Sequence, residues 1–329
     1  MFKDIIAQVS KNSIYSGNRS VDIIKRQVSP DTVFSIDDEI RHRKLRTNVM
    51  THFSKIKITD IDKLVDEWLD NVVLKNKELN VHDIVHEIVI HAFRDYLCPG
   101  TDLDEIRLCI NDFLHDTRSL LKTRHNYILN IPEDSLIDHD DIITLMKVGY
   151  SNIHSMLSSL ITRLAENYDE LYPELIDSLE NNRLKFNTTK NTAASRFFMA
   201  TYQLAPPVWV NARKCCKEPV EVKLSNGNYI TFNPHSLILS PNFYLLRHQY
   251  GSDFNPDKFK DVKLNQVFPS AFSEGVNSCV GRQLALPIME TVIRKLLDYR
   301  IEIIESCDKY VGHVAIKYKY SPVIMVKDY

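Results

Sequence analysis

The chain has 329 residues, and its 41 Lys and Arg are almost balanced by 43 Asp and Glu, so neither nucleic acid nor an anionic membrane surface is indicated as a partner. The six cysteines include no CxxC pair, which argues against a disulfide framework and indicates a reducing compartment. No apolar run is long enough for a transmembrane anchor, and no signal peptide is evident. We therefore expect a soluble, cytoplasmic protein that, with only 8 glycines, is mostly helical.

The first clear element is a helix predicted over residues 37–54, where acidic residues come first and apolar residues then recur on one stripe. His42 and Arg46 are four residues apart, so they share one face of this helix. A solvated basic face is the simplest interpretation of this pair.

Further helices are predicted where apolar residues recur at i, i+3, i+4 and i+7 spacing, over residues 61–72, 84–93 and 103–114. The longest predicted helix runs from about Asp138 to about Asn167. Together these segments indicate a helical core.

Predicted strands are few and short. Alternating apolar residues on both sides of an Asn-Gly turn predict a hairpin over residues 220–232. A short buried strand follows at residues 236–241, and two more strands are predicted over residues 313–320 and 321–326. The expected fold class is mainly α with small β-sheets, that is, α+β.

The stretch FSEGVNSCVGRQLA, residues 272–285, presents Cys279 in a glycine-containing loop just before an apolar, helix-periodic run. The positive end of that helix dipole favours a thiolate over a thiol, so Cys279 is a candidate metal ligand or nucleophile. For a lone cysteine, the alternative is a small buried hydrophobic residue.

This stretch resembles the haem-binding signature of cytochromes P450, and it fills the five characteristic positions in register. They are Phe272, Gly275, Cys279, Gly281 and Ala285. It departs from the signature at Asn277, where the family usually has an Arg or His that reaches a haem propionate. The resemblance implies haem b as the cofactor, with the Cys279 thiolate as the axial ligand of the iron.

Two other segments are similar to the family's propionate-binding segments. His42, Arg46 and Phe53 match a helix with His, Arg four residues later and Phe seven residues after that. Arg213, six residues after Pro207, matches an Arg that meets the second propionate, although an exposed Arg without a ligand is the alternative. The resemblance thus implies a cofactor-binding set of His42, Arg46, Arg213, Phe272 and Cys279, and no residue is assigned as catalytic.

Departures in the central helix bear on activity. In the family, an acidic residue and an alcohol in this helix relay protons during oxygen activation, and they follow an Ala-Gly pair. Here Val148 and Gly149 take the places of the pair, and Ser151 and Asn152 take those of the acid and the alcohol. Asn152 has neither an ionisable group nor a hydroxyl, so the resemblance leaves proton delivery without its usual group.

The family's buried ionic triad of one Glu and two Arg is also replaced. Its positions hold Ala200, Gln203 and Lys258. Because the members change together, no single buried charge is left unpaired, and we expect the loss to be tolerated. The flexible stem of Lys258 should let its ammonium group reach solvent.

The domain organisation implied is a truncated cytochrome P450 fold. We expect residues 33–329 to form one haem domain after a short N-terminal segment, residues 1–32. The region up to Pro132, where the family has helices and loops that cover the substrate, is short and implies a reduced lid.

The function implied first is that of a monooxygenase, which inserts one oxygen atom from O2 into an apolar small-molecule substrate. Electrons would come from a separate ferredoxin- or flavoprotein-type redox partner, since the chain has no GxGxxG nucleotide motif. A variant would use peroxide or rearrange an already oxygenated substrate. The alternatives are a haem-binding relative without monooxygenase turnover, acting as a carrier, sensor or interaction protein, and a helical scaffold without haem.

Overall fold

The structure is a computed structural model. It describes residues 15–16, 32–33, 36, 38–73, 77–115, 127–182, 186, 191–208, 210–215, 219–224, 226–234, 236–262, 271–272, 278–307, 310–311, 317–318 and 321–327. The helices and strands lie within these ranges.

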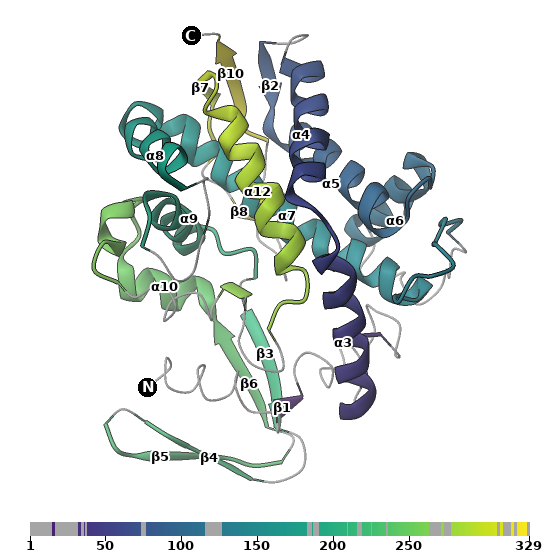
Figure 1. Cartoon of the computed structure of the whole chain (residues 1–329). Helices are drawn as coiled ribbons and strands as arrows, with labels where there is room; N and C mark the ends of the chain where they lie inside the picture. The colour runs from purple at the N-terminus through teal and green to yellow at the C-terminus, as the bar shows by residue number, and fades with distance from the viewer. Residues whose placement is uncertain are drawn as a thin grey trace.

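Most of the described residues are helical, and the helices gather around the long helix α7 (Figure 1). The helices are α3 (Glu39–Ser54), α4 (Ile58–Val73), α5 (Val81–Leu97), α6 (Leu103–His115), α7 (His139–Glu166), α8 (Tyr168–Asn182), α9 (Ala193–Leu204), α10 (Asn242–Tyr250), the 3-10 turn η3 (Pro256–Phe259) and α12 (Arg282–Leu296). The helices predicted at 37–54, 61–72, 84–93, 103–114 and 138–167 are confirmed as α3 to α7. The sequence analysis does not predict α8 or α10.

Side-chain caps explain where several of these helices begin. The Asp38 carboxylate accepts a hydrogen bond from the Arg41 amide at 2.7 Å, at the start of α3. Asp138 accepts from the Asp141 amide at 2.8 Å, at the start of α7. Each cap satisfies an amide that has no partner inside the helix. Because capping depends on neighbouring residues alone, helix starts of this kind can be predicted locally.

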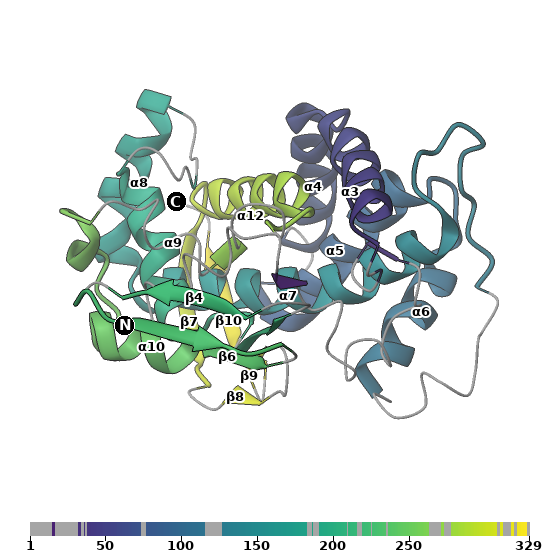
Figure 2. The ribbon, with the colours of Figure 1, turned by 90° about the horizontal axis from the view of Figure 1, so that it is seen from below.

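The core of the molecule lies around α7, which contacts α5, α6, α9 and α12. Its residues from Ile153 to Thr162 are all buried, so the helix has neighbours on every side there. One hydrophobic cluster extends from Val33 to Val326 and includes residues of each of these helices. Figures 1 and 2 show α8, α9 and α10 on one side of α12, and α3, α4 and α6 on the other.

The strands form small antiparallel sheets among the described residues. They are β1 (Tyr15–Ser16), β2 (Glu78–Asn80), β3 (Val210–Cys215), β4 (Val220–Lys223), β5 (Tyr229–Phe232), β6 (Leu237–Pro241), β7 (Arg300–Glu305), β8 (Tyr310–Val311), β9 (Lys317–Tyr318) and β10 (Val323–Lys327). The sheet orders are β1-β3-β6, β2-β10-β7, β4-β5 and β8-β9.

The predicted hairpin is confirmed as β4 and β5, which pair from Val220 with Phe232 to Lys223 with Tyr229. Gly227 in its turn has φ +86°, a conformation that side chains disfavour. The strands predicted at 236–241 and 321–326 are confirmed as β6 and β10. Of the strand predicted at 313–320, only β9 lies within the described residues. The sequence analysis does not predict β7, the strand that pairs with β10.

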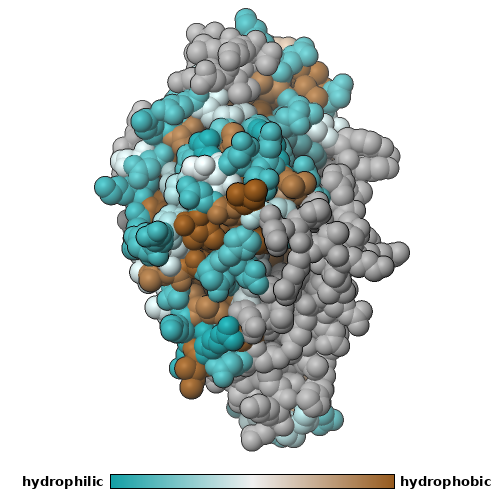
Figure 3. Space-filling view, turned by 90° about the vertical axis from the view of Figure 1, so that its right-hand side faces the viewer, coloured by the Kyte–Doolittle hydropathy of each residue, from teal (hydrophilic) through white to brown (hydrophobic). Residues whose placement is uncertain are grey.

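The surface is mixed, and none of the described helices is both long and apolar enough to cross a membrane. Hydrophobic residues lie near the middle of the face shown in Figure 3, among hydrophilic ones. Among the described residues, Ile40 in α3 is 83% exposed and Ile128 before α7 is 78% exposed.

Candidate functional site

Cys279 lies where the sequence analysis expects it, just before a helix. Gly281, two residues later, is the N-cap residue of α12, which begins at Arg282. The Cys279 amide donates to the Phe272 carbonyl oxygen at 2.6 Å. This bond brings together the two ends of the signature loop, whose intervening residues 273–277, including Gly275 and Asn277, lie outside the described residues.

The Cys279 side chain is exposed to solvent, yet burial among protein atoms raises the pKa of its thiol. The amides of Gly281 and Arg282 and the charges of Arg46 and Arg282 act in the opposite direction on this pKa. Burial is the largest of these effects, so the pKa of this thiol lies above its ordinary value, and the expected thiolate ligand stays a prediction.

Arg46 of α3 reaches the Cys279 loop from the other end of the chain. Its Nη2 donates to the Ser278 hydroxyl at 3.0 Å. His42 lies one turn earlier in α3 and is 4% exposed, so it is not part of a solvated face. The sequence analysis does not predict the contact of Arg46 with Ser278. The only local signal for this contact is that Ser278, next to Cys279, carries a hydroxyl.

Phe272 is half-buried and packed between two other side chains. Its ring stacks on Phe198 of α9, with 6.1 Å between centroids and 14° between planes. On another side the Arg282 guanidinium lies 5.3 Å from the Phe272 centroid. These contacts fix the residue whose carbonyl accepts the Cys279 amide.

Arg213 is in the middle of β3, where its backbone pairs with Ile238 of β6. Its side chain lies outside the part of the chain whose side chains are described. The expected role of Arg213 at a propionate therefore stays a prediction.

The face of α7 that meets α5 packs closely against it, through ring-bearing side chains and through a glycine. The Tyr150 hydroxyl is 2.6 Å from His86 Nδ1, and the His154 and His82 rings are 5.0 Å apart. A Cβ at Gly149 would come 3.2 Å from Phe93 Cζ. Gly149 is therefore a packing glycine toward α5.

The opposite face of α7 is partly accessible near the middle of the helix. Val148, Ser151 and Asn152 are half-buried, whereas Ile153–Thr162 are buried. Because these three residues are spaced three and four apart, they share one face, turned away from α5. The Ser151 hydroxyl donates to the Val148 carbonyl oxygen at 3.4 Å, so it is directed to its own helix.

The three positions that correspond to the family's ionic triad hold two uncharged side chains and one lysine in an ion pair at the surface. Ala200 and Gln203 are fully buried, and the Gln203 amide nitrogen donates to the Gly251 carbonyl oxygen. The Lys258 ammonium pairs with the Asp253 carboxylate, which lowers the pKa of that carboxyl. Lys258 is 28% exposed, so it is partly accessible to solvent, as expected.

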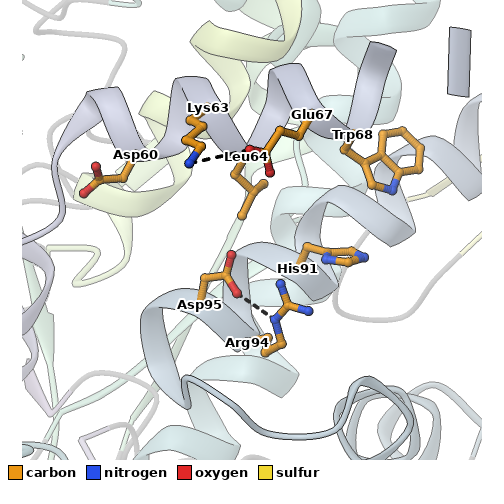
Figure 4. A pocket seen from close by; sticks show the side chains of 8 residues that line it. All are labelled: Asp60, Lys63, Leu64, Glu67, Trp68, His91, Arg94 and Asp95. Atoms are coloured by element: carbon orange, nitrogen blue, oxygen red, sulfur yellow. Dashed lines mark hydrogen bonds and ion pairs between the residues drawn. The ribbon is translucent and has the colours of Figure 1, made fainter. Parts of the chain in front are cut away.

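A separate groove of about 380 Å³ lies between α4 and α5 (Figure 4). Its charged side chains pair within the groove: Lys63 Nζ with Glu67 at 3.6 Å, and Arg94 Nε with Asp95 at 2.6 Å. Such exposed pairs contribute less than about 1 kcal/mol each. The groove contains none of the residues around Cys279, and we assign it no function.

Comparison with solved structures identifies the fold. A retinoic acid-bound cyanobacterial cytochrome P450 matches with TM-score 0.72 and 13% identity, over 96% of this chain and 84% of that chain. A six-coordinated cytochrome P450 from Thermus thermophilus matches with TM-score 0.71 and 12% identity, over 99% and 91%. P450 BioI in complex with an acyl carrier protein carrying hexadec-9Z-enoic acid matches with TM-score 0.70 and 14% identity, over 98% and 90%.

The chain therefore has the cytochrome P450 fold, as its sequence motifs predict, and it is mainly helical with small antiparallel sheets. At these identities the likeness establishes the fold alone. No protein-family model and no curated protein matches the sequence.

Proposed function

We propose that this chain is a haem-thiolate protein in which Cys279 is the axial ligand of a haem b iron, and that it is a monooxygenase acting on an apolar substrate. The observation that carries the proposal is the position of Cys279, which is exposed to solvent just before α12 in a chain with the P450 fold. Residues 33–329 would form the haem domain.

The residues around Cys279 fit a flat, anionic ligand such as haem. A Cβ added at Gly281 would meet no atom of the described residues within 4 Å, so those residues leave space beside the cysteine. Arg46 contributes a positive charge that acts on the Cys279 thiol, and a guanidinium presents its N–H donors in a planar arrangement that suits a carboxylate. Arg46 and His42 would therefore bind a propionate, and Arg213 is proposed for the other.

The chemistry would be divided between cofactor and chain. A haem with a thiolate ligand supplies oxygen activation, because the thiolate donates electron density that favours cleavage of the O–O bond. The chain would bind the iron through Cys279, hold the propionates, and line the substrate side with the accessible face of α7. A separate ferredoxin- or flavoprotein-type partner would supply the electrons.

An apolar substrate is supported by the similar structures, two of which contain retinoic acid and hexadecenoic acid on a carrier protein. We extend to this chain only the apolar character of these compounds. Val148 on the accessible face of α7 agrees with it.

A second candidate is a reaction that needs no proton delivery to dioxygen, such as peroxide use or rearrangement of an oxygenated substrate. Asn152 favours it, because an amide cannot relay protons as a hydroxyl or carboxyl does. The Ser151 hydroxyl donates to the Val148 carbonyl oxygen of its own helix, which also disfavours it as a relay. Haem binding without turnover is favoured by Ser151 and Asn152 and also by Ala200 and Gln203.

The test is the carbon monoxide difference spectrum of the purified, haem-supplemented and reduced protein. A red-shifted, thiolate-type Soret band is expected. A band typical of histidine ligation would contradict Cys279 as the ligand, and no bound haem would contradict the whole proposal and leave a scaffold without haem. Turnover with O2 and a reductant is then compared with anaerobic conversion of a fatty-acid hydroperoxide. Activity in the second assay alone would favour the rearranging candidate.

A further inference from the structure

Lys147 of α7 is a buried cation. It is 7% exposed, and it is the only buried Lys or Arg among the residues whose side chains the structure describes. Lysines ordinarily keep their ammonium group in water, because the burial of an unpaired charge is costly. A lysine held below the surface therefore needs a partner for its charge.

Within the described part of the chain, that partner is present only as an aromatic ring. Lys147 Nζ lies 5.2 Å from the centroid of the Tyr127 ring, in the segment that precedes α7. A ring face attracts a cation but carries no full negative charge. The described residues offer Lys147 neither an ion pair nor a hydrogen-bond acceptor. The three donors of its ammonium group are thus available to an anion.

The carboxylate nearest to Lys147 along α7 belongs to Asp141, and it serves another group. Asp141 precedes Lys147 by six residues, whereas side chains on a helix meet at spacings of three and four. Its Oδ1 accepts from the Val33 amide at 2.7 Å. Asp141 therefore does not supply the negative charge that Lys147 needs.

Lys147 borders the face of α7 that is proposed to line the substrate side. Ser151 lies four residues further along, so the two side chains share one face of the helix. Side chains of a helix lean toward its N-terminus, which agrees with the contact of Lys147 with Tyr127. The ammonium group is therefore at the N-terminal end of this face, with Val148, Ser151 and Asn152 beyond it.

We propose that Lys147 binds a carboxylate of the substrate, so that the substrate class is an apolar carboxylic acid of the fatty-acid type. The inference deepens the proposed function and rests on it. The carboxylate would complete an ion pair with the buried ammonium group, and the apolar remainder would extend along the face that carries Val148. An analogue without the charge would be rejected, because it leaves the cation unpaired.

The experiment measures the binding of three probes of equal chain length to the haem-loaded chain by isothermal titration calorimetry. Dodecanoate carries the carboxylate, methyl dodecanoate has the same apolar chain without a charge, and dodecylamine carries the opposite charge. Dodecanoate should bind at least about tenfold more tightly than the ester, and the amine should bind most weakly. Butanoate, an anion with little apolar surface, should also bind at least about tenfold more weakly than dodecanoate.

Variants of Lys147 then test whether this residue causes the preference. Lys147→Met removes the charge and keeps an unbranched side chain. Its dissociation constant for dodecanoate should rise by about 10- to 100-fold, with little change for the ester. Lys147→Arg keeps a cation and should retain most of the preference. Lys63→Met, the matched control, changes the net charge equally at a side chain that is 77% exposed, and it should bind the probes as the unaltered chain does.

A purely structural role of Lys147 predicts a different pattern. If the ammonium group only holds the Tyr127 ring, Lys147→Met should weaken the binding of acid and ester equally and lower the urea midpoint of unfolding. If it binds a substrate carboxylate, the midpoint without ligand should be unchanged or higher, because an unpaired buried charge is removed. Should Lys147→Met fail to fold, Lys147→Arg and the preference of the unaltered chain for acid over ester decide the question.

Failure of this inference is distinguishable from failure of the proposed function. Equal affinity of the unaltered chain for dodecanoate and its ester, or no binding of dodecanoate, overturns the inference, as does an effect of Lys63→Met that matches that of Lys147→Met. None of these results alters the thiolate-type spectrum, which tests the proposed function. If instead the chain binds no haem, the proposed function fails, and the same titrations on the haem-free chain still decide whether Lys147 selects a carboxylate.

Discussion

Arg46 Nη2 donates to the hydroxyl of Ser278, across 232 residues of sequence, at 3.0 Å. The contact joins α3 to the residue immediately before Cys279. It places a cation where it acts on the thiol, so the two motifs predicted from separate parts of the chain meet in one site.

Arg46→Gln should weaken haem binding without changing the iron ligand. Gln still donates to Ser278 but lacks the charge that pairs with a propionate, and charged hydrogen bonds contribute about 1.5–3 kcal/mol. We expect the haem dissociation constant to rise by about 10- to 100-fold, with the thiolate-type band retained at saturating haem. Arg43→Gln, an exposed residue of the same helix, is the control, and an equal effect of both would argue against a specific propionate site.

Cys279→Ala should abolish the thiolate-type carbon monoxide band, because no other sulfur takes its place before α12. Cys307→Ala removes a buried cysteine and should leave the band intact, although its stability cost is expected to be about 1 kcal/mol or more. The two variants are compared by the same spectrum, normalised to bound haem. Loss of the band in both would mean that Cys279 is not the ligand.

Asn152→Thr should raise oxygenase turnover if the missing proton relay limits the reaction. A hydroxyl at this position supplies general acid–base assistance that typically contributes 10²–10⁴-fold, so a gain of about tenfold or more is expected. The measurement is the rate of product formation, together with the ratio of product formed to O2 consumed. Ser151→Ala, which removes a hydroxyl bonded to its own helix, should change this ratio little. No gain for Asn152→Thr would shift support to the candidate that needs no relay.

Gly149→Ala should destabilise the chain because the new methyl group meets the ring of Phe93, which is 1% exposed and cannot yield easily. Overpacking costs about 1–3 kcal/mol, against a gain of about 1 kcal/mol in helix propensity. In a Phe93→Leu background the same change should become neutral or stabilising. Urea unfolding of the unaltered chain, the two single variants and the double variant gives the coupling between the two changes in unfolding free energy. If these changes are additive, the two residues do not collide.

Asp141→Asn should stabilise the chain at neutral pH. Burial raises the pKa of the Asp141 carboxyl to about 6, and its Oδ1 accepts from the Val33 amide at 2.7 Å, a bond that Asn can also accept. The folded state binds the proton more tightly than the unfolded state, so this group's contribution to stability is full below about pH 4 and is lost as pH rises through about 6.

The contribution of Asp141 to the free energy of unfolding is lower at pH 7 than at pH 4 by at most about 3 kcal/mol, from the shift of its pKa between 3.8 and about 6. Thermal unfolding of the two proteins between pH 4 and 8 should give curves that diverge from about pH 4 to about pH 6, with the Asn variant more stable above that. Asp140→Asn, at an exposed neighbouring position, should follow the unaltered chain. Parallel curves for Asp141→Asn would contradict the buried, high-pKa carboxyl.

The amino-acid sequence by itself determined the helices α3 to α7 and the Cys279 motif. Helix periodicity and caps such as Asp38 and Asp138 depend on residues within one or two turns, so they can be predicted without knowledge of the fold. The hairpin of β4 and β5 is local in the same way, since an Asn-Gly turn specifies it. By contrast, β7 is stabilised by pairing with a strand some twenty residues further along the chain, and the sequence analysis does not predict it.

Only the tertiary structure decided which of these parts meet. The contact of Arg46 with Ser278 and those of Asn191 with residues 259–262 join segments that no local pattern connects, because they arise from the packing of helices. Folding also set the direction of the Cys279 pKa. The helix dipole is a local property that favours the thiolate, but burial, which belongs to the folded molecule, outweighs it.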